Sequence, residues 1–380
     1  MKIKTLLLST ITLAAALAAC NNGSKQKSSE EWVIKNDMWE YENIDFEEIA
    51  EVVDIKSIVS DEPIAELQIF ISGSSNDFII CDRFHRQIFY HIVNGQMTEK
   101  LQAAGNGPTE YNHIDCFSYL PADSLLYGFD RRGRIICFKT SPFKFVSYIP
   151  TDYIVTDMFA LGRDHLLLTA FASDADSCAI YEFDGQTMNR LVNAELYMVN
   201  SMFPAYSRSG NDVLVAVKKE NIILYQYAEG QMQKVATIDY GKWNFNQDKQ
   251  YETELEDGMT MINWKDHARG CKNVQFDGST LAYWYMPILK EEPHRHLTIA
   301  THDNHHNYEI HIGGLNVEVN CGMLDNGVYT MLIQGDWESK IKPDEELSVT
   351  GKRIIETLKQ NEGNPINLQF RLKDKYLNNN

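Results

Sequence analysis

Histidines are concentrated in one short part of the chain. Six of the eleven histidines fall within eighteen consecutive residues, where His302, Asp303 and His305 stand close together. Imidazole nitrogens beside a carboxylate suit zinc or another transition metal. His294 and His296 alternate, which places both on one face of an extended strand. No H-E-x-x-H motif accompanies these residues, and their polar neighbours are typical of a solvated hairpin. We therefore predict no metal and no cofactor, with His302, Asp303 and His305 as the residues that would hold a metal.

A second group of interest is the long connection over residues 235–275, which interleaves aromatic and acidic side chains. Trp243, Phe245 and Trp264 stand among carboxylates there. Aromatic rings stack on the C–H faces of sugars while polar groups bind the hydroxyls. An exposed acidic run of this kind is more often a solvated loop, which is the favoured interpretation. The alternative is carbohydrate contact, and we predict that these three residues would make it.

The same connection holds the candidates for catalysis. Glu252, Glu254 and Glu256 alternate, so an extended chain would point all three carboxylates to one side. Two of them, or one with Asp257, could supply the acid and base for glycosidic cleavage. However, an exposed acidic run is usually a solvated loop, and the nucleophile motif G-x-S-x-G is absent from the sequence. We therefore predict no catalytic residue.

The first twenty residues have the pattern of a secretion signal. Lys2 and Lys4 precede an uncharged stretch, residues 5–19, that is too short for a stable membrane span. This stretch ends in Leu-Ala-Ala-Cys, which resembles the bacterial lipobox, whose cysteine is acylated and becomes the mature N-terminus. The predicted organisation is a signal peptide over 1–19, lipidated Cys20 with a flexible tether over 20–35, and a folded domain over 36–380.

The residues after Cys20 indicate a location. By resemblance to known sorting rules, Asn21 favours the outer membrane. Acidic residues just after the cysteine mark surface export in some bacteria, and the first one here is Glu30. We therefore predict an outer-membrane lipoprotein on the periplasmic side, with the membrane as one partner and a glycan, peptide or envelope protein as another.

Composition excludes several protein classes. With 44% hydrophobic and 23% charged residues, the chain is neither disordered nor a multi-span membrane protein. Asp and Glu number 53 against 35 Lys and Arg, and the formal charge of −18 becomes −20 once the signal's two lysines are removed. Such an acidic surface repels phosphate backbones, so nucleic acid is excluded as a partner. Six cysteines follow Cys20 without a C-x-x-C motif, and we predict buried thiols rather than disulfides.

These candidate residues must be positioned by a repeating architecture. Pairs of short apolar runs recur along the chain, beginning with residues 77–82 and 87–93. The repeats start at Asp77, Asp123, Asp164, Asp212, Gly278 and Asn326, at intervals of 46, 41, 48, 66 and 48 residues. A period near 45 residues is typical of β-propeller blades, because radial stacking buries both faces of each four-stranded sheet. We predict an all-β, six-bladed β-propeller; a large β-sandwich is the alternative.

Two features depart from the repeat. Residues 348–360 place Ile354, Ile355 and Leu358 on one stripe, which predicts a short helix with Ser348 or Thr350 as its cap. Residues 366–372 predict a last strand that reaches back to the blade near residues 65–71 and closes the ring. The loop GNGPTEY, residues 105–111, lacks the Lys-Ser/Thr of a phosphate-binding loop. We predict a tight turn in which the glycines supply positive φ values and Glu110 and Tyr111 form the anchoring hydrogen bonds.

Three segments then resemble a known family. GNGPTEY is similar to the G-x-G-P-G-E-Y segment of six-bladed β-propeller lipoproteins of Bacteroidales, although Thr109 replaces the usual glycine. Asp239-Tyr240-Gly241 and Asn364-Pro365 with the strand after it resemble two further segments of that family. The resemblance implies a propeller, export, and likeness to NHL-type and TolB-like propellers that act mainly as binding platforms. We predict a binding or accessory platform; the alternative is an envelope hydrolase or lyase at the channel mouth, where Asp82 or Asp130 could hold calcium.

Overall fold

The structure is a computed structural model, and its compact folded unit runs over Val33–Asn380. Cys20, the predicted signal and most of the predicted tether lie outside the residues that it describes. The described residues are 32–61, 64, 69–82, 87–172, 178–193, 206–209, 212–218, 221–244, 252–254, 260–262, 267, 270–289, 292–319, 322–361 and 364–377.

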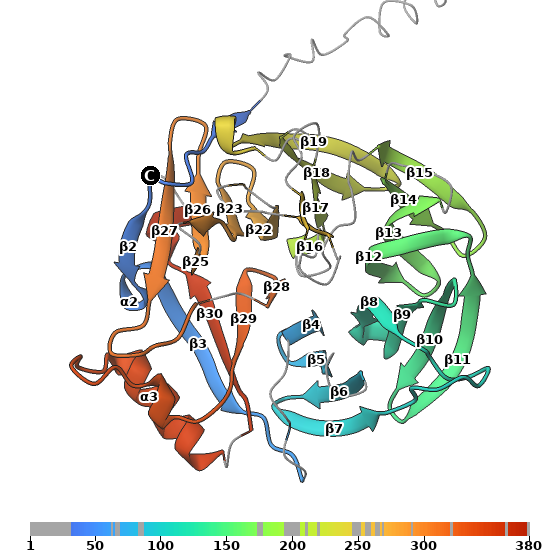
Figure 1. Cartoon of the computed structure of the whole chain (residues 1–380), viewed down its shortest axis with the longest axis horizontal. Helices are drawn as coiled ribbons and strands as arrows, with labels where there is room; N and C mark the ends of the chain where they lie inside the picture. The colour runs from blue at the N-terminus through green and yellow to red at the C-terminus, as the bar shows by residue number, and fades with distance from the viewer. Residues whose placement is uncertain are drawn as a thin grey trace, which may run out of the picture. The chain divides into compact units, whose positions relative to one another are not determined.

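Six sheets of four or five strands are arranged around a ring (Figure 1). This confirms the predicted six-bladed β-propeller. Blade 1 contains β4 (Ile69–Gly73), β5 (Asp77–Asp82), β6 (Ile88–Val93) and β7 (Gln96–Leu101). Blade 2 contains β8 (Ile114–Leu120), β9 (Leu125–Asp130), β10 (Arg134–Thr140) and β11 (Phe143–Pro150). Blade 3 contains β12 (Tyr153–Gly162), β13 (His165–Ala172), β14 (Ala179–Phe183) and β15 (Met188–Asn193).

The N-terminal segment supplies an outer strand to each of the remaining blades. Blade 4 contains β16 (Tyr206–Ser209), β17 (Asp212–Lys218), β18 (Ile222–Ala228) and β19 (Gln231–Asp239), with β1 (Val33–Lys35) added to its edge. Blade 5 contains β22 (Cys271–Phe276), β23 (Leu281–Tyr285), β26 (His296–Ala300) and β27 (His305–His311), with β2 (Glu42–Asp45) added. Blade 6 contains β28 (Met323–Asp325), β29 (Val328–Ile333), β30 (Ile366–Leu372) and β3 (Ala50–Ser57). The strands nearest the centre of the ring are β4, β8, β12, β16, β22 and β28 (Figure 1).

The remaining elements are short. Two hairpins are formed by β20 (Glu252–Glu254) with β21 (Thr260–Ile262) and by β24 (Ile288–Leu289) with β25 (Glu292–Pro293). The helices are α2 (Phe46–Ile49), α3 (Val349–Gln360), α4 (Asp374–Leu377), and the single turns η1 (Pro121–Asp123), η2 (Gly241–Trp243) and η3 (Glu338–Lys340). Within the described part of the chain, none of the helices combines the length and hydropathy needed to cross a bilayer.

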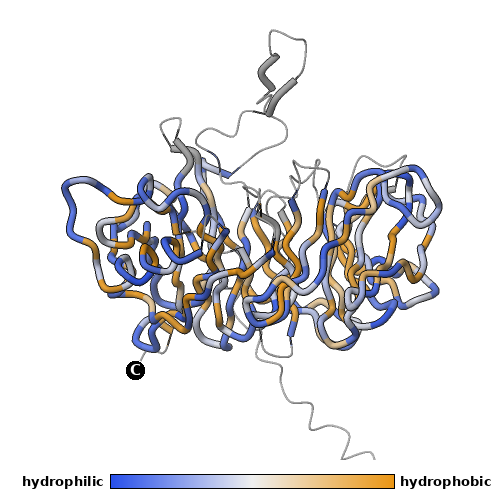
Figure 2. Tube along the Cα trace, turned by 90° about the horizontal axis from the view of Figure 1, so that it is seen from below, coloured by the Kyte–Doolittle hydropathy of each residue, from blue (hydrophilic) through white to orange (hydrophobic). Residues whose placement is uncertain are grey.

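The apolar runs seen in the sequence are the two middle strands of each blade. In blade 2, for example, all of β9 is buried, and β10 is buried over most of its length. The outer strand β11 instead alternates between half-buried and exposed residues. Figure 2 shows the same contrast, since apolar residues follow the strands while polar residues occupy many of the turns. Middle strands are covered on both faces by neighbouring blades, which is why they read as continuous apolar runs.

Two hairpins depend on left-handed backbone conformations at an Asn-Gly pair. Asn94 and Gly95 have φ values of 50° and 83°, and Asn326 and Gly327 have 49° and 74°. Consecutive positive φ values form the turn that matches the twist of paired strands, and Asn-Gly adopts them at little cost. Asn94-Gly95 therefore joins β6 to β7, and Asn326-Gly327 joins β28 to β29.

The GNGPTEY loop is a structural turn, as predicted, and its glycines serve close packing. The Gly107 N–H donates to Glu110 Oε2 at 2.7 Å, and the Tyr111 hydroxyl donates to the Gln87 carbonyl. A Cβ on Gly105 would lie 2.1 Å from Glu110 Oε2, and one on Gly107 would lie 2.9 Å away. Neither glycine has a positive φ. The expectation that they supply φ > 0 was therefore wrong: they make room for the Glu110 carboxylate.

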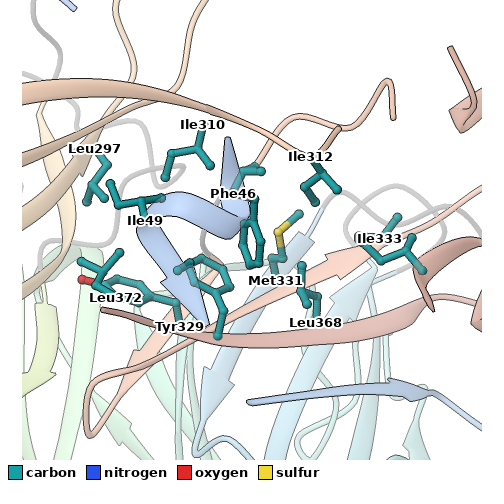
Figure 3. Packing of buried hydrophobic residues seen from close by; sticks show 14 of the residues in the cluster. Phe46, Ile49, Leu297, Ile310, Ile312, Tyr329, Met331, Ile333, Leu368 and Leu372 are labelled. Atoms are coloured by element: carbon teal, nitrogen blue, oxygen red, sulfur yellow. The ribbon is translucent and has the colours of Figure 1, made fainter. Parts of the chain in front are cut away.

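The last strand closes the ring with a different partner from the one predicted. β30 pairs with β29 on one side and with the N-terminal strand β3 on the other, from Ala50↔Leu372 to Ser57↔Ile366. The blade near residues 65–71 is blade 1, and β30 is not one of its strands. Phe46 and Ile49 of α2 are fully buried in the same apolar cluster as Leu368 and Met331 (Figure 3). The two chain ends are thus joined by both a strand ladder and a core.

Helix α3 and the cysteines match their predictions. Ser348 is the cap, and its side chain accepts a hydrogen bond from the Gly351 N–H, while Ile354, Ile355 and Leu358 are buried. The described cysteines are buried as thiols and form no disulfide with one another: Cys81, Cys116, Cys137, Cys178 and Cys271. Burial raises the pKa of the Cys137 thiol to about 12 and that of Cys178 to about 11, so both stay protonated. Cys321 lies outside the described residues.

Candidate functional site

A strap formed by residues 33–45 joins two blades along their outer edges. Its first strand, β1, pairs in parallel with β19 of blade 4, and its second strand, β2, pairs in parallel with β27 of blade 5. The strap therefore covers two sheet edges that would otherwise expose unpaired backbone groups. Val33–Lys35, at the end of the segment predicted as a tether, form the first of these strands.

The turn between β1 and β2 is fixed by a buried polar network. The side-chain amide of Asn36 lies 2.9 Å from Tyr283 Oη, 3.1 Å from Thr298 Oγ1 and 3.1 Å from Asn307 Oδ1. Asn307 donates back to Asn36 Oδ1 at 2.8 Å and also to the Glu40 carbonyl at 2.9 Å. Tyr283, Thr298 and Asn307 face one another in register across blade 5. This row holds the strap in one position.

The strap presents Trp39 beside Trp243, one of the residues predicted to contact carbohydrate. The two ring centroids lie 5.5 Å apart with an angle of 49° between the ring planes. The Lys242 ammonium lies 4.4 Å from the centre of the Trp243 ring. Both indoles are half-buried, and Lys242 is exposed. The sequence analysis missed Trp39 because nothing in the local pattern shows that residue 39 meets residue 243.

Trp243 is held by the Asp239-Tyr240-Gly241 segment. Asp239 Oδ1 accepts hydrogen bonds from the Gly241 N–H at 2.8 Å and from the Asn244 side-chain amide at 2.7 Å. Gly241 has a φ of 58°, and Tyr240 is buried beneath the turn. The left-handed glycine lets η2 begin directly after β19. The segment thus presents a tryptophan on a rigid turn.

The other predicted residues of the 235–275 connection are less fully described. Phe245 and Trp264 lie outside the described residues, as do Glu256 and Asp257. Glu252 and Glu254 belong to β20, which pairs with β21 in a separate hairpin. Carbohydrate contact at Phe245 and Trp264 therefore stays a prediction.

The histidine-rich hairpin brings together a different group from the one named in the sequence. His302 and Asp303 are exposed in the turn after β26, and His305 begins β27. The group of three potential ligands that the described residues form is His294, His296 and Glu309. Glu309 was missed because it faces His296 only once the register of β26 and β27 is fixed. The four-residue turn between β26 and β27 was the sequence signal from which this register could have been predicted.

His296 has an unusual environment. Its side chain is fully buried, its Nδ1 lies 3.1 Å from Tyr285 Oη, and its Nε2 has no hydrogen-bond partner among the described residues. Burial, reinforced by the neighbouring His294, lowers the pKa of His296 to about 3. The imidazole is therefore neutral at physiological pH. The Tyr41 ring of the strap lies over it, with 4.4 Å between the centroids.

Asp130 was a candidate calcium ligand at the channel mouth, and its carboxylate already has partners. Arg132 and Arg134 donate to Oδ2 at 2.8 Å and 3.0 Å, and the Asn112 N–H donates to Oδ1. Burial raises the pKa of the Asp130 carboxyl, but these hydrogen bonds outweigh it and hold the pKa below its usual value. The two guanidinium groups in turn bind carbonyl groups of the GNGPTEY turn, including that of Pro108. Asp130 thus anchors a turn.

Comparison with known proteins supports the fold alone. No family model and no curated protein matches the chain. A crystal structure of a Bacteroides fragilis protein described as exported is similar over 90% of this chain and 99% of its own, at 15% identity and a TM-score of 0.62. A member of the DUF4221 family from Bacteroides vulgatus covers 85% of this chain and 98% of its own, at 8% identity and a TM-score of 0.45. At 15% identity, the Bacteroides fragilis structure supports the fold and nothing further.

Proposed function

We propose that this protein is a lipid-anchored binding platform of the bacterial cell envelope that contacts carbohydrate through Trp39 and Trp243. The observation that carries the proposal is the pairing of these two half-buried indoles at 5.5 Å. Each tryptophan is held on its own turn. The backbone N–H of Trp39 donates to Asp37 Oδ1 at 3.0 Å, and Trp243 follows the turn that Asp239 stabilises. Rigidly held indoles lose little conformational freedom on binding a sugar.

The tilt of the pair suits a sugar ring better than a flat aromatic ligand. At 49° the two indoles do not form a parallel slot. A saturated sugar ring can instead place one C–H face on one indole and an edge against the other, while exposed groups such as Lys242 and Glu40 take hydroxyls. Peptide aromatic side chains are the competing ligand class.

The proposed anchor is compatible with this location on the propeller. Twelve residues separate Cys20 from Val33, where β1 begins on the outer edge of blade 4. An extended chain of this length reaches at most about 45 Å. A lipidated Cys20 would therefore keep the start of β1 within about 45 Å of the bilayer surface. The exported description of the similar Bacteroides fragilis protein supports an envelope location.

A glycan array followed by affinity measurement tests the proposal. The full chain, purified in detergent, is expected to retain a defined class of glycan. Trp39→Ala and Trp243→Ala should each weaken binding of the best glycan by about 5- to 150-fold, equivalent to about 1–3 kcal/mol. Array signal that both variants keep unchanged would contradict the assignment to this pair.

Trp337 provides a matched control. Its indole is also half-buried and also lies under a lysine, with the Lys359 ammonium 4.0 Å from the ring centre. Trp337→Ala removes a similar indole and lysine contact from blade 6 and should leave glycan affinity unchanged. Melting temperatures of all three variants separate lost binding from lost folding. An equal loss of affinity in Trp337→Ala would show a general effect of tryptophan removal.

A further inference from the structure

The start of β26 places two histidines and a glutamate around one point. His294 and His296 flank one residue at the beginning of that strand, and Glu309 lies directly opposite His296 on β27. Tyr285 of β23 faces His296 from the other side. The row lies on the second, third and fourth strands of blade 5, away from the innermost strand.

One pair of ligand atoms has the spacing of a tetrahedral metal site, and the third ligand atom lies within 4.8 Å of both. His294 Nδ1 and Glu309 Oε1 lie 3.2 Å apart, and one ligand atom from each of the three residues lies within 4.8 Å of the others. Ligands at about 2.0–2.1 Å from a tetrahedral ion are separated by about 3.3 Å. One pair already has this separation. Small rotations of the half-exposed His294 and Glu309 side chains can bring the third ligand into range.

The second observation is the orphan nitrogen of His296. Its Nε2 is buried and makes no hydrogen bond within the described part of the chain, a situation that costs free energy in a folded protein. Its Nδ1 lies beside Tyr285 Oη at 3.1 Å. Metal-bound histidines commonly make such a hydrogen bond with the other ring nitrogen, which fixes the ring orientation and the tautomer. A metal on Nε2 would give both nitrogens partners.

We propose that His294, His296 and Glu309 form a binding site for a divalent transition metal of the zinc type. Two neutral imidazoles and one carboxylate are the ligand set of open zinc sites, and nitrogen ligands select against calcium and magnesium. The side chains of His294 and Glu309 are 20% and 24% exposed, so solvent can supply a fourth ligand. Tyr41 of the strap covers the His296 ring, so the metal also stabilises the contact between the strap and blade 5.

The test uses the untagged full chain, dialysed against EDTA and titrated with Zn²⁺ and with Co²⁺ as a spectroscopic probe. We expect one equivalent of Zn²⁺ and the visible absorption of Co²⁺ bound to nitrogen and oxygen ligands. The side chains of His294 and Glu309 are partly exposed, so their replacement should leave the fold intact. His294→Gln and Glu309→Gln should each weaken Zn²⁺ binding by about 100-fold or more. Tyr285→Phe should weaken it by about 10-fold, because it removes only the partner of Nδ1.

His165 and Glu182 supply the control. They form a histidine–carboxylate pair at 2.7 Å in blade 3, outside the group of three ligands. His165→Gln should bind Zn²⁺ like the wild type. The proposal is overturned if the wild-type chain binds no stoichiometric Zn²⁺, if His294→Gln and Glu309→Gln bind it as tightly as the wild type, or if His165→Gln loses as much affinity. Melting temperatures in EDTA establish that every variant is folded.

Discussion

Asn36 and Asn307 exchange hydrogen bonds in both directions between their side-chain amides, at 3.1 Å and 2.8 Å. Both residues are buried, and they come from opposite ends of the chain. The pair connects the strap to blade 5 through contacts that no apolar residue can replace. Loss of either amide leaves the other without its partner.

Asn36→Ala should therefore destabilise the propeller by about 2–4 kcal/mol, because Tyr283, Thr298 and Asn307 each lose a hydrogen-bond partner in a buried site. Urea unfolding of the two proteins measures the difference. Asn43→Ala is the control, since Asn43 is exposed on the same strap and bonds only to His311 among the described contacts. A similar free energy of unfolding for the wild type and Asn36→Ala would contradict this role.

Gly105→Ala should destabilise the GNGPTEY turn by about 1–2 kcal/mol. The Glu110 carboxylate accepts a hydrogen bond from the Gly107 N–H, and the new Cβ would displace this carboxylate and break the bond. In a Glu110→Ala background the same substitution should cost little, because the displaced group is gone. A double-mutant cycle measured by thermal unfolding gives the coupling. Additive effects would show that the two residues do not meet.

Gly270→Ala is the control for that cycle. A Cβ at Gly270 would meet no atom of the described residues within 4 Å, apart from its own chain neighbours, and the residue has no positive φ. The same glycine-to-alanine change should therefore leave the melting temperature nearly unchanged there.

Asp130→Asn should reduce stability at pH 7 by about 2–4 kcal/mol, because Arg132 and Arg134 lose the buried charge that they share. The pKa of Asp130 is below its usual value in the folded protein. Its stabilising contribution is present above the usual pKa of an aspartate and is lost as the pH falls through the folded value.

Urea unfolding of both proteins between pH 7 and pH 2 checks this dependence. The difference between wild type and Asp130→Asn should shrink toward the acid end. Asp184→Asn, at an exposed turn, should show a smaller difference at pH 7. A difference that stays constant with pH would contradict an ionised Asp130.

Cys20→Ala should move the protein from the membrane fraction to the soluble fraction, because the acyl chains supply the anchoring. Labelling with a radioactive fatty acid and cell fractionation measure the change. Unlabelled wild-type protein, or membrane-bound mature Cys20→Ala, would contradict the lipoprotein prediction.

The sequence predicted the middle strands of each blade well, and the reason is their burial on both faces. Residues 77–82 were predicted as a strand and form β5 with the same ends. Outer strands such as β15 are polar or alternating and gave no such signal. The roles of β1 and β2 could not be predicted, because short strands become edge strands only where the neighbouring sheet presents a free edge.

The candidate sites show the same limit. Trp243 was recognisable from its type and surroundings, whereas Trp39 and Glu309 acquire their importance from residues that they meet only in the fold. The type of a residue shows which chemistry its side chain can perform. Strand register and the addition of edge strands decide which of these residues lie close together in the fold.

The pairing of β3 with β30 has a consequence for how the chain folds during synthesis. Between residue 57 and residue 366 lie 308 residues, so blade 6 cannot assemble until all of them have been synthesised. Contacts between such distant segments form slowly, because the intervening chain must first be brought into a closed loop. Until then β3 lacks its strand partner, and the apolar cluster around Phe46 lacks Leu368, Phe370 and Leu372 of β30. We therefore expect a chain truncated before Ile366 to leave β3 unpaired and to aggregate.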